Sequence, residues 1–294
     1  LSRATWTYSW RSVNGRYNYQ IRPIDLNWIN VGYLDESFFN SLRNEYLRQS
    51  YQTQAIVGLS ASYVYNNQNK NINGNATLMR INFESAGNLL NLFERAFSHK
   101  VEGGYYNILG VRYSQYVRSD ISISRKIVLG EKTALAGRIF AGCGVPYGNS
   151  SALPFDRLFY VGGSNSMRGW VARTLGPGNA VVEDTPYPVQ MGDMRLEANL
   201  EFRFPIWGMF HGATFLDLGN VWYLGMDKTQ LPAESIFHFN RFYKQLGFNT
   251  GFGLRLDIKF VILRLDWGIQ LHNPNNPAGE RWIHNFRWKN TALN

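Results

Sequence analysis

One arginine, Arg168, stands in a loop segment whose composition suits a confined space. The stretch GGSNSMRGW runs from Gly162 to Trp170, inside a long segment between two strand-like regions. An arginine offers five donors in a planar fork and stays protonated, so away from bulk water it needs carboxylate partners, ideally bidentate ones. Gly169 permits a tight or positive-φ path, and Trp170 adds a large rigid contact whose indole N–H can find a partner. We therefore predict that this loop folds back into an enclosed space.

Other chemistry-bearing residues do not form a recognisable catalytic set. A Gly-x-Ser-x-Gly nucleophile elbow is absent from the sequence. Gly176–Gly178 reads GPG with no following Lys-Ser/Thr, which indicates a turn and not a phosphate cradle. Cys143 lies between two glycines in an alternating segment, which favours a small packing residue over a nucleophile. The five histidines are dispersed without metal-ligand spacing: His99, His211, His238, His272 and His284. We predict no enzyme activity, no cofactor and no metal.

Composition favours a β protein, and a membrane barrel in particular. The 294 residues are 45% hydrophobic and 15% aromatic, with a formal charge of +9 and a mean hydropathy of −0.29. No run approaches the ~20 apolar residues of a membrane-spanning helix. Lysine and arginine are scattered along the chain, so we expect no nucleic-acid partner. The single cysteine excludes an intrachain disulfide framework, and the abrupt start at Leu1 suits a mature product or a fragment.

Hydrophobic residues recur with a period of two. From Asp193 the sequence reads DMRLEANLEFRFPIWG, with an apolar and a charged face over about ten residues, as in a tilted strand crossing a bilayer. The side chains expected to face lipid are Leu196, Leu200, Phe202, Phe248, Phe252, Leu254, Leu265 and Trp267. Those expected to face the lumen are Arg195, Glu197, Glu201, Arg255, Arg264 and Asp266. Further strands are expected near 3–13, 16–30, 52–66, 75–87, 105–128, 132–146 and 209–223, beside those within 246–258 and 261–272.

Connections between these strands alternate between short and long. Turns at 129–131, 205–208 and Lys259-Phe260 should lie at one end, as do the short periplasmic turns of outer-membrane barrels, and the long connections at the other. Ten strands and a stub at the final TALN predict a piece of a larger barrel, which lacks strands before Leu1 and the end of the strand that begins at Thr291. We expect residues 35–47 to form a short loop-capping helix with Phe38, Phe39 and Leu42 on one side; a partner-docking helix is the alternative.

Three segments in order resemble the BamA/TamA superfamily of outer-membrane assembly barrels. They are PFDRLFYVGGSNSMRGW, GDMRLEANLEFRFPI and GATFLDLGNVW, and they are similar to the TamA-like TamL proteins of Bacteroidota. The resemblance implies the C-terminal part of a 16-stranded antiparallel transmembrane barrel, spanning 1–294, whose periplasmic domains lie outside this chain. It further implies that Arg168 of the Met167-Arg168-Gly169-Trp170 motif is held in the lumen by Glu201 and Asp217. Both carboxylates point inward by the alternation. Trp170 replaces the family's usual Phe or Tyr.

The same resemblance implies function. It predicts a non-enzymatic factor of the bacterial outer membrane that inserts or translocates client proteins, with outer-membrane lipid around it and a periplasm-spanning partner or accessory lipoproteins beside it. Lipid is an alternative cargo. Three competing roles stay open on the sequence: a general BamA-type insertase, a passive porin or transporter with an open lumen, and the exporter of a fused hydrolase.

Overall fold

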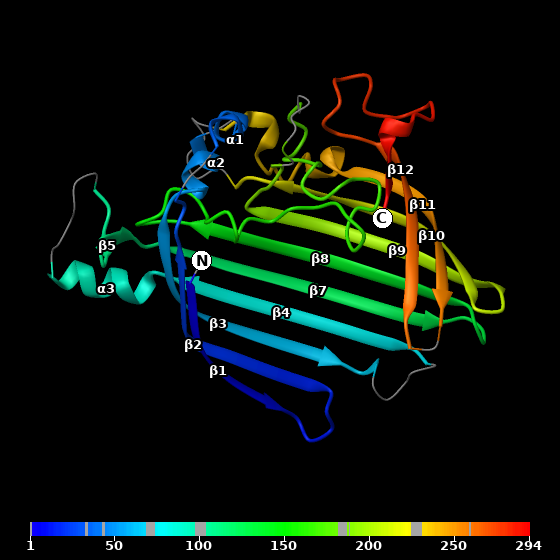
Figure 1. Ribbon diagram of the computed structural model, residues 1–294, viewed down its shortest axis with the longest axis horizontal. Helices are drawn as coiled ribbons and strands as arrows, with labels where there is room; N and C mark the ends of the chain where they lie inside the picture. The colour runs from blue at the N-terminus through cyan, green and yellow to red at the C-terminus, as the bar shows by residue number, and fades with distance from the viewer. Residues whose placement is uncertain are drawn as a thin grey trace.

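The computed structural model describes residues 2–32, 35–42, 45–68, 74–97, 104–181, 187, 189–224, 231–258 and 260–294. Its dominant feature is one long, curved antiparallel sheet (Figure 1). Eleven strands pair in the order in which they occur in the chain, and β5 (Asn107–Ile108) and β6 (Val111–Arg112) form a separate two-stranded ribbon. None of the described helices is long and apolar enough to cross a membrane.

The strands have the length expected of a bilayer-spanning sheet. Most run for 10–14 residues, close to the ~9–11 residues that a tilted strand needs to cross a bilayer. The main-sheet strands are β1 (Ser2–Arg11), β2 (Tyr17–Ile29), β3 (Gln54–Asn66), β4 (Ala76–Ala86), β7 (Tyr116–Val128), β8 (Ala134–Pro146), β9 (Met194–Trp207), β10 (Phe210–Trp222), β11 (Gly247–Asp257), β12 (Ile262–His272) and β13 (Thr291–Leu293). The predicted antiparallel barrel is confirmed, including the short strand at the final TALN. Within the described residues β1 and β13 do not pair, so the sheet is a partial barrel.

Strand registers place the short turns at one end. Val128 pairs with Ala134 across the β7–β8 turn, and Ala134 in turn pairs with Arg203 near the end of β9. Phe210, the first residue of β10, pairs with Leu256 near the end of β11. The turns after β7, β9 and β11 therefore share an end, as predicted. Strand β9 continues through 205–207, so the connection expected at 205–208 is only two residues long; Lys259 lies outside the described residues.

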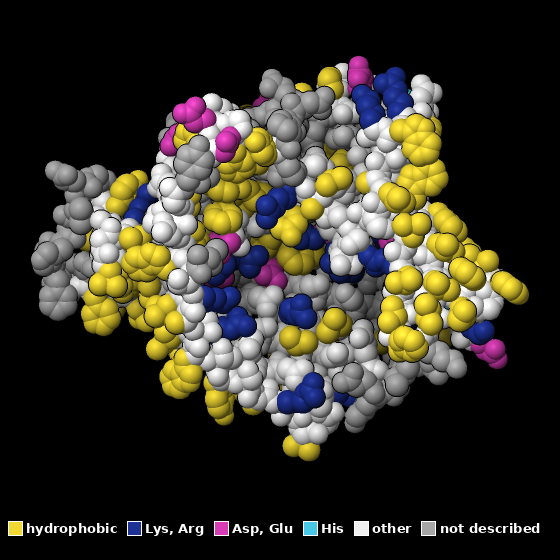
Figure 2. Space-filling model, in the orientation of Figure 1, with side chains coloured by type: hydrophobic (Ala, Val, Ile, Leu, Met, Phe, Trp, Pro, Cys, Tyr) yellow, Lys and Arg dark blue, Asp and Glu magenta, His cyan; other side chains and the backbone are white. Residues whose placement is uncertain are grey.

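The two faces of the sheet separate by polarity. All eight side chains predicted to face lipid point to the outer face, and Leu200, Phe252 and Leu265 are among the most exposed. The six predicted lumen residues point to the inner face, where Glu201 and Asp266 are buried. Figure 2 looks onto the concave side, where Lys and Arg side chains gather, while hydrophobic side chains lie along the outer edges. This polarity is that of a transmembrane barrel, apolar outside and polar inside.

The long connections meet at the opposite end and build most of the packed core. Their buried side chains form a cluster over the mouth of the sheet, including Leu42, Tyr46, Leu153, Met191 and Tyr223. Because these residues come from connections far apart in the sequence, the core is a cap on the barrel and not a filling of its whole interior.

The predicted helix at 35–47 is divided into two. Helix α1 (Glu36–Ser41) begins at Asp35, whose side chain accepts from the backbone N–H groups of Ser37 and Phe38, and α2 (Glu45–Ser50) follows it. Phe38 packs edge-on against Tyr51 and Tyr187 and Leu42 is fully buried. Phe39 does not share their face: it is 38% exposed, with the Arg48 guanidinium over its ring.

Two further expectations are corrected. The strand expected from residue 105 begins only at Tyr116, because the preceding residues form the ribbon of β5 (Asn107–Ile108) and β6 (Val111–Arg112). Leu109 and Gly110 both have positive φ, the conformation of a tight two-residue hairpin turn. The connection at 88–104 contains a helix that was not predicted, α3 (Asn88–Phe97). The short 3-10 turns are η2 (Ala233–Ser235), η3 (Phe242–Gln245) and η4 (Trp288–Asn290).

Candidate functional site

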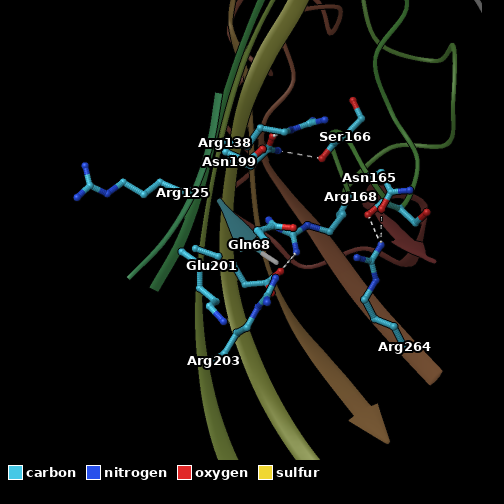
Figure 3. Close-up of a pocket in the computed structure, with 15 residues that line it drawn as sticks. Gln68, Arg125, Arg138, Asn165, Ser166, Arg168, Asn199, Glu201, Arg203 and Arg264 are labelled. Atoms are coloured by element: carbon cyan, nitrogen blue, oxygen red, sulfur yellow. Dashed lines mark hydrogen bonds and ion pairs between the residues drawn. The ribbon is translucent and has the colours of Figure 1, made fainter. Parts of the chain in front are cut away.

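The connection between β8 and β9 folds back against the inner face of the sheet. Phe159 pairs with Gly192 in an isolated bridge, which closes the base of the folded segment. The tip is narrow: the Gly163 N–H donates to the Trp170 carbonyl at 2.8 Å. We call residues 159–181, 187 and 189–192 the inner loop. Its tip carries the segment that the sequence analysis singled out, and it brings Arg168 to the lumen wall (Figure 3).

Arg168 binds Asp217 with its side chain and its backbone. The guanidinium donates from Nη2 to Asp217 Oδ1 at 2.7 Å and from Nε to Oδ2 at 3.0 Å, while the Arg168 backbone N–H donates to Oδ2 at 3.0 Å. Asn199 and Asn249 each donate a further side-chain hydrogen bond to the same carboxylate. Asp217 is 0% exposed and Arg168 4%, so five donors replace the water that a carboxylate would otherwise hold.

A second carboxylate completes the coordination of the guanidinium. Arg168 Nη1 donates to Glu201 and lies 3.7 Å from Asp266 Oδ2. Arg255 joins the same cluster, with its Nη2 3.0 Å from Glu201 Oε2 and 3.4 Å from Asp266 Oδ1. Arg264 lies 3.1 Å from Asp266 Oδ2. The cluster alternates positive and negative groups, so each buried charge has opposite charges beside it.

The tip of the inner loop approaches the wall too closely for side chains. Gly169 does not have a positive φ, contrary to one of the expected options; a Cβ there would lie 2.7 Å from Asn249 Cβ. Gly268 on β12 is likewise close to the loop, because a Cβ there would lie 2.2 Å from the Arg168 carbonyl oxygen. The guanidinium carbon of Arg168 also lies 3.5 Å from the centre of the ring of Phe215 on β10, which is a cation–π contact.

Trp170 packs into an apolar cluster inside the loop. Its neighbours are Phe159, Val161, Met167 and Leu175, together with Val221 of β10. The expectation that its indole N–H finds a partner is wrong within the described residues, where Nε1 is buried without one. The role of the ring at this position is therefore packing.

A parallel ion network holds the other side of the loop tip. Ser166 Oγ donates to Glu197 Oε2 at 2.7 Å and accepts from the Gly162 N–H. Arg138 and Arg195 both form ion pairs with Glu197, whose side chain is 0% exposed. Two buried carboxylates, Glu197 and Asp217, thus receive the loop on neighbouring strands, β9 and β10.

The part of the connection before the inner loop has its own contact with the far wall. Arg157 Nε donates to Glu84 Oε1 of β4 at 2.8 Å and to Tyr116 Oη of β7 at 3.1 Å. Its Nη1 donates to Asp156 Oδ2 at 2.6 Å, and its carbonyl accepts from Arg118 Nε at 3.1 Å. The connection therefore touches both halves of the sheet.

Asp193 closes the base of the inner loop. It is fully buried, accepts from the Tyr46 hydroxyl of α2 and accepts from the Leu224 N–H at 3.0 Å. Burial raises the pKa of this carboxyl to about 7, while the two hydrogen bonds act in the opposite direction. Burial also raises the pKa of the Tyr46 hydroxyl well above its ordinary value.

A cavity of about 410 Å³ remains between the loop tip and the wall on the side of the short turns (Figure 3). Arg138, Arg203 and Arg264 border it, and Arg125 points away from it. The positive charges of Arg138, Arg203 and Arg264 are paired with the carboxylates of Glu197, Glu201 and Asp266. Among the described residues, no three His, Cys, Asp or Glu side chains are arranged to hold a metal ion.

The structure brings Arg168, Gly169, Glu201 and Asp217 together, and places Trp170 in the adjoining apolar cluster. Strand alternation predicted the lumen face for Glu197, Arg255, Arg264 and Asp266 but did not assign them to the cluster. Asn199 and Asn249 share that face by the same alternation. Phe215, Ser166, Arg157 and Asp193 were missed, although Arg157 lies in the quoted PFDRLF segment.

Two solved structures are similar to this chain. A solved structure of BamA from Haemophilus ducreyi, lacking POTRA domains 1–3, matches with a TM-score of 0.58 and 18% identity over 99% of this chain and 52% of that one. The chain thus spans about half the length of that structure. CdiB from Acinetobacter baumannii matches with a TM-score of 0.49 and 13% identity, over 93% of this chain and 39% of that one.

The search of curated proteins found no match. The family comparison is decisive, because the Omp85 superfamily domain matches residues 3–288, nearly the whole chain. The chain belongs to the Omp85 superfamily.

Proposed function

We propose that this chain is the barrel portion of an outer-membrane factor that inserts or translocates client proteins, without enzymatic chemistry. Membership of the Omp85 superfamily supports this role, and so does the outward apolar face of the sheet. The H. ducreyi BamA structure supports the fold. The bacterial outer membrane is the compartment that fits such a barrel.

The observation that carries the proposal is the pairing of Arg168 with Asp217 and Glu201. A buried ion cluster contributes little net stability compared with apolar packing, and its better-attested role is to select one arrangement. We infer that Arg168, Gly169 and Trp170 hold the inner loop in a single position in the lumen. A loop fixed there occupies part of the lumen, which favours a barrel whose wall must keep its shape while clients are handled over a passive pore with an open lumen.

The more specific part of the proposal is a TamA-like role, in which a periplasm-spanning partner works with the barrel. The similarity of the sequence segments to TamL proteins supports it. A general BamA-type role is the alternative, and it predicts accessory lipoproteins. Purification of the full-length protein with its native partners separates these roles by the class of protein that accompanies it.

The experiment uses the full-length protein in its own cells, with Arg168→Ala, Arg168→Lys and a control, Arg80→Ala. Arg80 is an exposed arginine on the lumen face of β4, remote in the sheet from β10. Folding of the protein itself and of its client barrels is followed by heat-modifiable migration. We expect Arg168→Ala to lower the folded fraction of clients more than its own folded fraction. Lysine should restore part of the loss, because it keeps the charge without the planar fork.

Two outcomes would contradict the proposal. Normal client assembly by Arg168→Ala would separate the inner loop from the function. Stable ion conductance by the purified unmodified protein, with client assembly unaffected by its removal, would favour the porin alternative.

A further inference from the structure

The helix α3 has its polar side turned toward the barrel. Asn88 Oδ1 accepts from Tyr147 Oη at 2.8 Å and from Gln115 Nε2 at 3.1 Å. One turn later, Asn91 is buried, with its Nδ2 3.5 Å from Tyr113 Oη. Two asparagines on one side of the helix thus fasten it to the rim of the sheet.

The outward side of the same helix is apolar. Leu89, Leu92 and Phe93 are 63%, 67% and 61% exposed. Their spacing of three and four residues places them on one face. A helix at the surface of a soluble protein has the reverse orientation, with its apolar stripe toward the core. An apolar face turned away from the protein requires an apolar environment outside it.

That face continues the outer surface of the sheet. Strand β4 leads into α3 through Gly87 alone, which has a φ of +72° and would place a Cβ 2.4 Å from the Ser114 carbonyl oxygen. On the outer face of β4 and its neighbour β3, Ile81, Phe83 and Leu59 are exposed apolar side chains. Figures 1 and 2 show α3 projecting from the sheet at the left, with hydrophobic side chains over it and over the nearby strand ends.

We propose that α3 is an interfacial amphipathic helix, which inserts Leu89, Leu92 and Phe93 among the acyl chains of the outer leaflet. It lies at the end of the sheet that carries the long connections, the extracellular end of such barrels. Helices that lie in the plane of a membrane bury one apolar face at the boundary of headgroups and acyl chains. The inference depends on the membrane placement of the sheet and not on the assembly function proposed above.

Lipid fits this face better than a protein partner does. A specific protein interface covers about 800 Å² per partner and roughly 20–30 residues a side, whereas the described outward face of α3 offers three side chains. Its continuity with the lipid-facing surface of β3 and β4 points to the same bilayer as its occupant.

The test places a fluorescent probe at position 92. Cys143, the one cysteine of these 294 residues, is first replaced by serine, together with any cysteine elsewhere in the full-length protein. Leu92→Cys is labelled with the polarity-sensitive dye NBD and the full-length protein is reconstituted in dioleoylphosphatidylcholine vesicles. Asn40→Cys is the matched control, because Asn40 is an exposed residue of α1, a helix of the capping connections. Heat-modifiable migration checks that each variant is folded, and Leu89→Cys replaces a position-92 variant that is not.

The position-92 probe should emit at shorter wavelength than the position-40 probe. It should be quenched by lipids that carry a nitroxide on the acyl chain and protected from aqueous iodide, whereas the position-40 probe should show the opposite behaviour. Equal iodide quenching at both positions would overturn the proposal. Protection from iodide without quenching by the nitroxide lipid would also overturn it, and energy transfer between labelled copies would then identify a second copy as the occupant.

Discussion

Arg168 and Asp217 form a bidentate ion pair that the backbone N–H of Arg168 extends to a third hydrogen bond. The two side-chain hydrogen bonds fix the orientation of the guanidinium, and the backbone hydrogen bond fixes the distance between the loop and β10. Lysine could not replace Arg168 while keeping all three bonds, because only the guanidinium presents donors in this planar arrangement.

Replacement of Arg168 by alanine should release the tip of the inner loop. It leaves Asp217 and Glu201 buried without their shared cation, and loss of one partner of a buried pair costs about 3–5 kcal/mol. Water in the neighbouring cavity should reduce the cost toward the lower figure. Hydrogen exchange of the Gly163 and Trp170 amides in nanodiscs measures the opening free energy. The exchange rate of Arg168→Lys should fall between those of the unmodified protein and Arg168→Ala. Unchanged exchange in Arg168→Ala would contradict this expectation.

Gly169→Ala should destabilise the contact between the loop and β11, and Gly268→Ala the contact between the loop and β12. Their added Cβ atoms would meet Asn249 and the Arg168 carbonyl at distances that require movement, and such overpacking costs about 1–3 kcal/mol. Gly32→Ala is the matched control, since a Cβ there meets nothing within 4 Å and the residue has no positive φ. The same exchange measurement should show an effect for the first two variants only; an equal effect at Gly32 would indicate a general loss of stability.

Arg157→Ala should loosen the start of the connection without releasing its tip. The guanidinium bonds Glu84 and Tyr116, and hydrogen bonds to charged groups contribute about 1.5–3 kcal/mol each. Exchange should accelerate at the Phe155 amide, which donates to Ser50, but not at the Trp170 amide. Faster exchange at both amides would show that the connection moves as one unit.

Stability should fall as pH rises from about 4 to about 7 through the contribution of Asp193. Its pKa is raised from 3.8 to about 7 by burial, so in this window the native state holds a proton that the unfolded chain has lost. Stability therefore decreases with rising pH and becomes level above about 7. The temperature of the heat-modifiable transition at pH 5 and pH 8 measures this difference. Asp193→Asn should reduce it; an unchanged difference would assign the effect to other groups.

Alternation was sufficient to predict the sheet and the direction of most side chains. Leu200 and Phe252 alternate with Glu201 and Asn249 because the outer face meets lipid and the inner face does not. The resemblance then identified Glu201 and Asp217 among several inward carboxylates. Nothing in the sequence distinguished Asp217 from Asp266 as the main partner of Arg168, since that choice depends on where along the strands the loop tip meets the sheet.

Features that depend on tertiary contacts could not be predicted. The sequence pattern of helix α3 is that of an ordinary amphipathic helix. Only the rim contacts of Asn88 and Asn91 show that its apolar side faces outward. Two reasons were expected for Gly169, a tight path or a positive φ, and only its close approach to Asn249 shows that the tight path is the one that applies. Asp193 lies far in sequence from Tyr46, and their pairing follows from the meeting of two long connections.

The most direct test of the central claim is the accessibility of Asn165 from outside the cell. This residue lies at the tip of the inner loop, where its side chain accepts from Arg264 Nη2 at 3.0 Å. In a full-length protein whose own cysteines, Cys143 included, are replaced by serine, Asn165→Cys and Asn40→Cys are exposed in intact cells to a bulky maleimide that does not cross membranes. We expect rapid labelling at position 40, slow labelling at position 165, and faster labelling at position 165 when Arg168→Ala is added. Labelling at position 165 as fast as at position 40, with Arg168 intact, would contradict the central claim.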